Sequence, residues 1–110
     1  MPNVVEYIRE DQSNPYQRWF DALPIQAATK VATAKLRMEL GNTSSIKGFA
    51  GIGEYRIDWG PGYRIYLAKE GDTLIVLFGG GSKATQPADI RQAQALFAEY
   101  KARKKLMATG

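Results

Sequence analysis

Three cations between Glu54 and Lys83 are the residues of this chain with the clearest chemistry. Arg56, Arg64 and Lys83 lie on or just after three consecutive predicted strands, and the chain contains no histidine and no cysteine. Guanidinium and ammonium groups bind phosphate oxygens through charge-assisted hydrogen bonds. The sequence therefore predicts a site that holds a phosphodiester and stabilises the negative charge that develops on a transferring phosphoryl group.

The alternating pattern of the strands brings these side chains together. Side chains on a strand point to alternate faces, so Glu54 and Arg56 share one face, and Arg64 and Tyr66 share the polar face of the next strand. Like-oriented side chains on facing strands meet across the ladder. The two arginines are therefore expected to converge, with Lys47 approaching from an edge strand.

Acidic residues on this polar face have two interpretations. Glu54 and Asp58 are candidates for a proton relay, but they could equally neutralise the arginines. The structural alternative for Arg56 is a surface ladder of charges. Lys83 follows three glycines, which allow a ligand to approach the backbone closely, although the spacing of a P-loop is absent.

Eight predicted elements position these residues in the order β-α-α-β-β-β-β-α, an antiparallel-dominated α+β arrangement. The strands are expected at residues 3–8, 45–50, 53–59, 63–68 and 73–78. The helices are expected at residues 15–23 and 24–40, which form a hairpin, and from Pro87 onward. Glycines 79–81 are expected to end the last strand.

Each predicted helix has an apolar stripe that is expected to be buried. The stripes are, in chain order, Tyr16, Trp19, Phe20 and Leu23; Ile25, Ala28, Ala32, Leu36 and Leu40; and Ile90, Ala93, Phe97 and Tyr100. The basic run at residues 101–105 is expected to be a solvated helix end, with contact to a polyanion as the alternative.

Composition and charge indicate one globular domain over residues 1–110. The net charge of +4 comes from residues 41–110, where ten Lys and Arg face six Asp and Glu. This excess is suited to a polyanion or an acidic protein partner. Without cysteine, a disulfide framework and a thiolate site are excluded. Without a long apolar run or a leader-like start, the expected location is the cytoplasm.

Several motifs, taken together, resemble one protein family. They are Glu39-Leu40-Gly41-Asn42, Lys47, Glu54-x-Arg56-Ile57, Gly60-Pro61-Gly62-Tyr63-Arg64-x-Tyr66, and Gly80-Gly81-Ser82-Lys83-x-x-Gln86-x-x-Asp89-Ile90. Found in this order across residues 16–96, the set resembles the RelE/ParE toxin superfamily. It is most similar to the phage-related, HigB-like "addiction module killer protein" branch.

This resemblance implies a RelE-like fold and a toxin of a bacterial toxin–antitoxin system, inhibited by a cognate helix-turn-helix antitoxin. RelE-like members cut mRNA in the ribosomal A site, where the ribose 2′-hydroxyl attacks the adjacent phosphate without a metal or cofactor. Carried over, Arg64 matches the phosphate-contacting strand arginine, and Arg56 and Lys83 fall near other basic positions. Lys47, Tyr66 and Gln86 are the residues expected to bind the substrate around them.

The resemblance leaves two questions open. Without histidine the general base is unassigned, and Glu54 and Asp58 are the candidates. ParE-like members share the fold but poison DNA gyrase without catalysis, and a third possibility is a non-toxic antitoxin-binding or phage accessory module. For the nuclease, Arg64→Ala is expected to abolish growth inhibition and to leave the fold intact.

Overall fold

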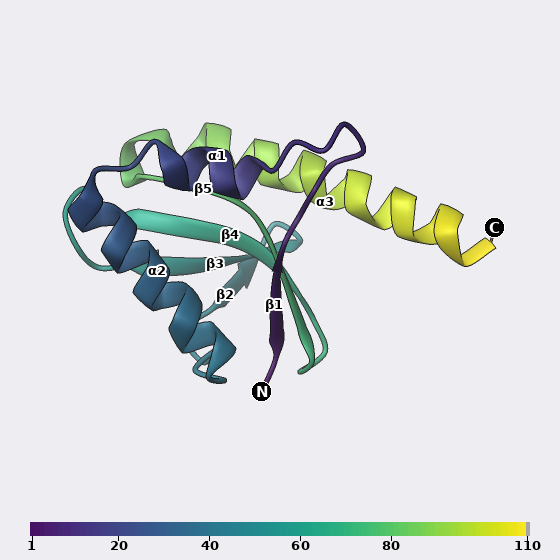
Figure 1. Cartoon of the computed structure of the whole chain (residues 1–110), viewed down its shortest axis with the longest axis horizontal. Coiled ribbons are helices and arrows are strands. Elements are labelled where there is room, and N and C mark those ends of the chain that lie inside the picture. Colours follow the sequence, from purple (N-terminus) through teal and green to yellow (C-terminus); the bar gives the residue numbers. More distant parts are fainter. Residues whose placement is uncertain (110) are drawn as a thin grey trace.

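The computed structural model describes residues 1–109, the side chains of Phe49 and Thr109 excepted. Five strands and three α-helices make up the fold (Figure 1). The strands are β1 (Asn3–Glu6), β2 (Lys47–Phe49), β3 (Ile52–Ile57), β4 (Tyr63–Glu70) and β5 (Leu74–Gly81). The helices are α1 (Pro15–Asp21), α2 (Ile25–Glu39) and α3 (Gln86–Thr109). A 3₁₀-helix, η1 (Lys83–Thr85), precedes α3 and is the one element that the sequence did not predict.

One five-stranded sheet, with the order β1-β5-β4-β3-β2, forms the centre of the molecule. All neighbouring strands are antiparallel except β1, which runs parallel to β5. The expected α+β class with a mostly antiparallel sheet is confirmed. Strands β1 and β2 are shorter than predicted, because only the first four residues of the range predicted for β1 and the middle of the range predicted for β2 pair with a neighbour.

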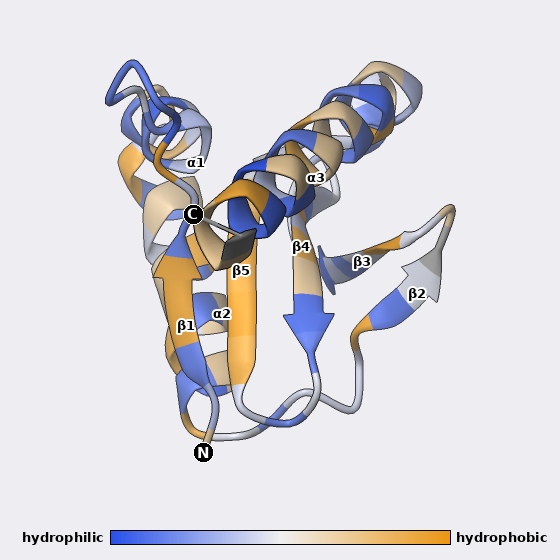
Figure 2. Cartoon of the chain, turned by 90° about the vertical axis from the view of Figure 1, so that its right-hand side faces the viewer, coloured by the Kyte–Doolittle hydropathy of each residue, from blue (hydrophilic) through white to orange (hydrophobic). Residues whose placement is uncertain are grey.

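Helices cover both faces of the sheet, and each face has its own core. The α1 and α2 face buries odd-numbered residues of the long strands, among them Ile65, Leu67 and Leu77. The α3 face buries Tyr66 and Phe78. This alternation is the period of two that a pleated strand imposes. In Figure 2, β5 is hydrophobic along most of its length, as expected for a strand with a neighbour on each side and helices over both faces of the sheet.

The start of α1 follows the predicted capping pattern. The Asn14 side chain accepts a hydrogen bond from the Gln17 N–H at 3.0 Å, and Pro15 occupies the first helical turn. Asparagine satisfies a free N–H there, and proline lacks the N–H that would otherwise stay unpaired. The predicted stripe is confirmed, since Tyr16 is buried and its apolar neighbours pack against the same core.

The predicted buried stripe of α2 is wrong. Ile25 is 85% exposed and Leu36 is 54% exposed, and Ala32 and Leu40 are exposed as well. The helix instead buries the stripe Ala27, Val31, Ala34 and Met38. Alanine and leucine occur on two faces of this helix, so periodicity alone did not decide between them. The buried stripe carries small alanines, which let the helix lie close to the sheet. The stop after α2 is as expected, with Gly41 at a φ of +91°.

The three glycines belong to β5 and do not end it. They pair with β4 in the register Gly79↔Tyr66, Gly80↔Ile65 and Gly81↔Arg64. A Cβ at Gly80 would overlap the Trp19 ring, and one at Gly81 would overlap the Asp89 carboxylate. Glycine is therefore required at these two positions by close packing rather than by a turn.

The last helix begins at Gln86, one residue earlier than predicted, and its far half extends beyond the rest of the molecule (Figure 1). Its inner face buries Ala93 and Leu96, the second of which the sequence did not indicate, while Ile90, Phe97 and Tyr100 are partly buried. Within residues 1–109, no helix is both long and apolar enough to cross a bilayer.

Candidate functional site

Arg56 and Arg64 meet on a single carboxylate oxygen. They are direct cross-strand partners on β3 and β4. Arg64 Nε donates to Glu54 Oε1 at 2.7 Å, and Arg56 Nε donates to the same oxygen at 3.1 Å. Like charges placed opposite each other on a ladder repel, and the shared carboxylate compensates for this repulsion. The predicted convergence of the two arginines is confirmed.

The inner part of this cluster is buried. Glu54 is 1% exposed and Arg64 is 7% exposed, whereas the Arg56 side chain is 54% exposed. The Arg64 Nη1 also donates to the Gly62 carbonyl at 3.1 Å, which ties the guanidinium to the turn between β3 and β4. A charge taken out of water in this way is stable only when it is paired and hydrogen-bonded. Arg64 therefore faces the protein, and Arg56 faces solvent.

Lys83 lies next to the same turn. It begins η1, and its backbone N–H donates to the Pro61 carbonyl at 3.3 Å. A Cβ built at Gly62 would be 3.6 Å from Lys83 Cβ and 3.8 Å from Arg64 Nη1. The stem of Lys83 and the buried guanidinium thus flank one glycine, and Lys83 itself is exposed.

Lys47 lies on β2 directly opposite Glu54. Cross-strand partners share a face, so Lys47 belongs to the same face as the two arginines and is exposed there. Three separate segments therefore supply cations to one region. They are Lys47 from β2, Arg56 and Arg64 from the β3–β4 hairpin, and Lys83 from the chain after β5.

Tyr66 lies opposite Glu54 on the other side, on β4. Its side chain is fully buried, and the hydroxyl has no hydrogen-bond partner within the described residues. Burial, with a smaller contribution from the negative charge of Glu54, raises the pKa of Tyr66 from 10.0 to about 12. The hydroxyl is therefore protonated at neutral pH and is a poor proton acceptor.

Gln86 and Asp58 are the remaining predicted site residues. Gln86 begins α3, and its Nε2 lies 3.4 Å and 3.5 Å from the two Glu54 oxygens, so it is a weak third donor to that carboxylate. Asp58 is exposed just beyond the end of β3, outside the Glu54 hydrogen-bond network. Glu54 accepts from both arginines, which is the arrangement of a counter-ion.

Two residues that sequence reasoning did not connect with the site support it from η1 and α3. The Thr85 hydroxyl donates to the Asp89 carboxylate, which lies against Gly81 beside Arg64 on β4. Gly81 is the sequence feature that could have revealed this contact, since a glycine inside a strand often marks such a close approach. In the part of the chain that the structure describes, no group of three or more acidic side chains is placed to hold a metal ion.

A comparison with known proteins gives one informative match, and no family model matches the chain. The match is an uncharacterized protein of Haemophilus influenzae, 40% identical over 86 residues, which cover 76% of this chain and 87% of that protein. At this identity and coverage, this chain and the Haemophilus influenzae protein belong to one protein family.

Proposed function

We propose that this protein is the toxin of a bacterial toxin–antitoxin pair and that it cleaves mRNA on the ribosome. The observation that supports this proposal is that Arg56 and Arg64 share the Glu54 carboxylate, with Lys47 opposite Glu54 on β2 and Lys83 beside the β3–β4 turn. Four cations against Glu54 and the nearby Asp89 leave an excess positive charge, which attracts a phosphodiester. The motif resemblance to the RelE/ParE superfamily supplies the toxin context and the expected helix-turn-helix antitoxin.

The proposal divides the cations into two roles according to their exposure. Arg56 and Lys83 are exposed and contact the scissile phosphate, with Lys47 binding the neighbouring backbone. Arg64 is buried on Glu54 and on the Gly62 carbonyl, so it positions Glu54 and, through it, Arg56. This is a change from the sequence-based expectation, in which Arg64 itself holds the phosphate.

The proposed reaction needs alignment and charge stabilisation more than a protein nucleophile. The ribose 2′-oxygen attacks the adjacent phosphorus, and the bond from phosphorus to the 5′-oxygen of the next nucleotide breaks. The 2′-hydroxyl proton leaves to water, and the departing 5′-oxygen takes a proton from water. The products are a 2′,3′-cyclic phosphate and a 5′-hydroxyl. Arg56 and Lys83 stabilise the charge on the non-bridging oxygens.

A second candidate is non-enzymatic inhibition of DNA gyrase, as in ParE-like proteins. It is favoured by the absence of a group suited to proton abstraction near neutral pH. The chain has no histidine, and the buried Tyr66 has a pKa of about 12. A non-toxic module that only binds an antitoxin is the third candidate, and it predicts no growth defect.

Induced expression in bacteria, with transcript 5′ ends mapped across the transcriptome, separates these candidates. The nuclease predicts growth arrest and new 5′ ends within coding regions, both weakened by Arg56→Ala. The matched control is Arg91→Ala, which removes an exposed arginine of α3 outside the cluster. Growth arrest with intact transcripts and a DNA-damage response would reject the nuclease in favour of gyrase inhibition. Arg64→Ala is unsuitable as a test of activity, because it leaves the buried Glu54 carboxylate without its main partner and destabilises the fold.

A further inference from the structure

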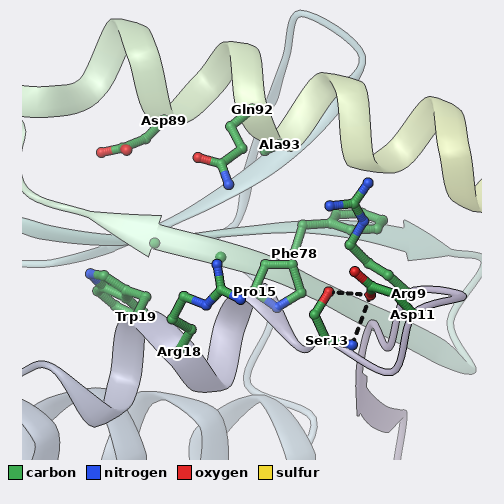
Figure 3. Close-up of a pocket in the computed structure, with 12 residues that line it drawn as sticks. Arg9, Asp11, Ser13, Pro15, Arg18, Trp19, Phe78, Asp89, Gln92 and Ala93 are labelled. Carbon is green, nitrogen blue, oxygen red and sulfur yellow. Dashed lines mark hydrogen bonds between the residues drawn. The ribbon is translucent and has the colours of Figure 1, made fainter.

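A cavity of about 400 Å³ opens beside the end of β5, between α1 and α3. Figure 3 shows Trp19 and Arg18 of α1 on one side of it, and Asp89 and Gln92 of α3 on the other. Gly79 and Gly80 also line it. Among the described residues, β3 and β4 contribute nothing to its lining, so the cavity is distinct from the arginine cluster on those strands, although Asp89 borders both.

The cavity follows an edge of β5 that has no neighbouring strand. The ladder with β1 ends at Glu6↔Leu77, and one further hydrogen bond joins the Tyr7 N–H to the Leu77 carbonyl at 2.9 Å. β5 continues to Gly81. Since successive residues of a strand direct their N–H and C=O to opposite edges, either Gly79 or Gly80 directs both groups away from β4. At that point β1 no longer runs alongside, and the backbone is available to another chain.

Glycine keeps this edge accessible. A Cβ built at Gly79 meets no atom within 4 Å, and Gly80 lies beneath the Trp19 ring. Another backbone can therefore approach Gly79 without meeting a side chain, whereas the Trp19 ring covers one face of Gly80. The stretch from residue 78 to residue 81 covers three steps of roughly 3.3 Å, or about 10 Å, which is room for about three or four residues of extended chain.

The charges in the cavity favour a peptide over a nucleic acid. Arg9 is paired with Glu99, and the Asp11 and Asp89 carboxylates accept hydrogen bonds from Ser13 and Thr85. Two arginines and two aspartates line the cavity, so it has no excess of positive charge to hold a row of phosphates but can still pair with a single carboxylate. The exposed Arg18 guanidinium forms no side-chain hydrogen bond or ion pair within residues 1–109, although its charge acts on the Asp11 carboxylate, so an occupant with a carboxylate would pair with it directly.

We propose that this groove binds an extended, acidic peptide segment of a partner protein. The segment adds as a strand beside residues 79–81, where β1 leaves the edge of the sheet open. Main-chain hydrogen bonds to the glycine edge provide the affinity, as in other cases of strand addition. Arg18 selects an acidic side chain, and the Gln92 amide is available to a polar one. This binding is independent of the proposed nuclease activity.

The probe is a set of acetylated hexapeptides of alternating threonine and valine, with one glutamate moved through the positions. Binding is measured by titration against the whole protein, with the amide resonances of Gly79 and Gly80 as site reporters. Two matched peptide controls carry either N-methyl groups on alternate amides or lysine in place of glutamate. We expect saturable binding of at least one glutamate peptide. N-methylation removes main-chain hydrogen bonds and should weaken this binding about tenfold or more, and each tenfold corresponds to about 1.4 kcal/mol.

Two variants test the site. Gly79→Val places a branched side chain in the open floor and should weaken binding about tenfold or more. Arg18→Glu on α1 should reverse the preference from glutamate to lysine peptides. Arg91→Glu, on α3 and outside the cavity, should not reverse it. If Gly79→Val loses its folded circular dichroism spectrum, Arg18→Glu decides alone. The proposal is overturned if no peptide binds by about 1 mM or if N-methylation has no effect on binding. It is also overturned if Arg18→Glu keeps the glutamate preference, or if an oligonucleotide instead of a peptide shifts the Gly79 and Gly80 amide resonances.

Discussion

At the residue scale, Glu54 organises the basic cluster. One of its oxygens accepts from Arg56 and Arg64, and a single carboxylate thus holds two guanidinium groups that face each other across the ladder. Strand alternation was enough to predict that the arginines meet. It did not reveal which of them turns inward, because this depends on the tie from Arg64 to the Gly62 carbonyl in the turn.

Glu54→Gln should lower the free energy of unfolding by about 3–5 kcal/mol, because it leaves the buried Arg64 charge without its partner. Denaturant unfolding followed by fluorescence measures this loss. Glu10→Gln is the matched control at an exposed position, where a change within about 0.5 kcal/mol is expected. If Glu54→Gln is as stable as the control, Glu54 is not the counter-ion of the cluster.

Tyr66 should make stability fall at alkaline pH. Its pKa is about 12 in the folded protein, against 10.0 for an unperturbed tyrosine. Between these values the folded state binds more protons than the unfolded state, so the free energy of unfolding decreases as pH rises. The Tyr66→Phe variant lacks this loss. From about pH 10 upward, its free energy of unfolding should therefore rise relative to that of the original protein. Unfolding curves at several pH values measure it, and parallel pH profiles would contradict the assignment.

At the element scale, patterns within one strand or turn predicted the structure well, and packing between elements was harder to predict. The capped start of α1 and the alternation of β3 and β4 depend on local chemistry, and both are confirmed. The buried face of α2 and the role of the three glycines depend on distant partners. Gly80 is required by Trp19, about sixty residues earlier in the chain, and no local pattern reveals this contact.

The corrected face of α2 can be tested with a matched pair of truncations. Met38→Ala removes a fully buried side chain and should cost about 2–5 kcal/mol of unfolding free energy. Leu36→Ala, two residues away on the same helix and half exposed, should cost much less. Chemical denaturation compares the two directly. A larger loss for Leu36→Ala would restore the stripe that periodicity first suggested.

At the scale of the whole molecule, the order of the strands creates both features of interest. Placing β4 between β3 and β5 brings Arg56, Arg64 and Gly81 side by side, and the chain after β5 then returns Lys83 to the β3–β4 turn. The parallel pairing of the short β1 leaves the far edge of β5 open. The sequence predicted the element order, but strand order and the end of β1 are long-range properties that periodicity does not encode.

The most direct test of the proposed nuclease uses purified protein and ribosomes programmed with a defined mRNA. We expect cleavage without added metal beyond that required by the ribosome, with 2′,3′-cyclic phosphate and 5′-hydroxyl ends. We also expect at least about a tenfold slower rate for Arg56→Ala and for Lys83→Ala, the scale of losing one phosphate contact, and an unchanged rate for Arg91→Ala. If the mRNA stays intact with an excess of folded protein over ribosomes, or if all variants cleave it equally fast, the protein is not the proposed nuclease.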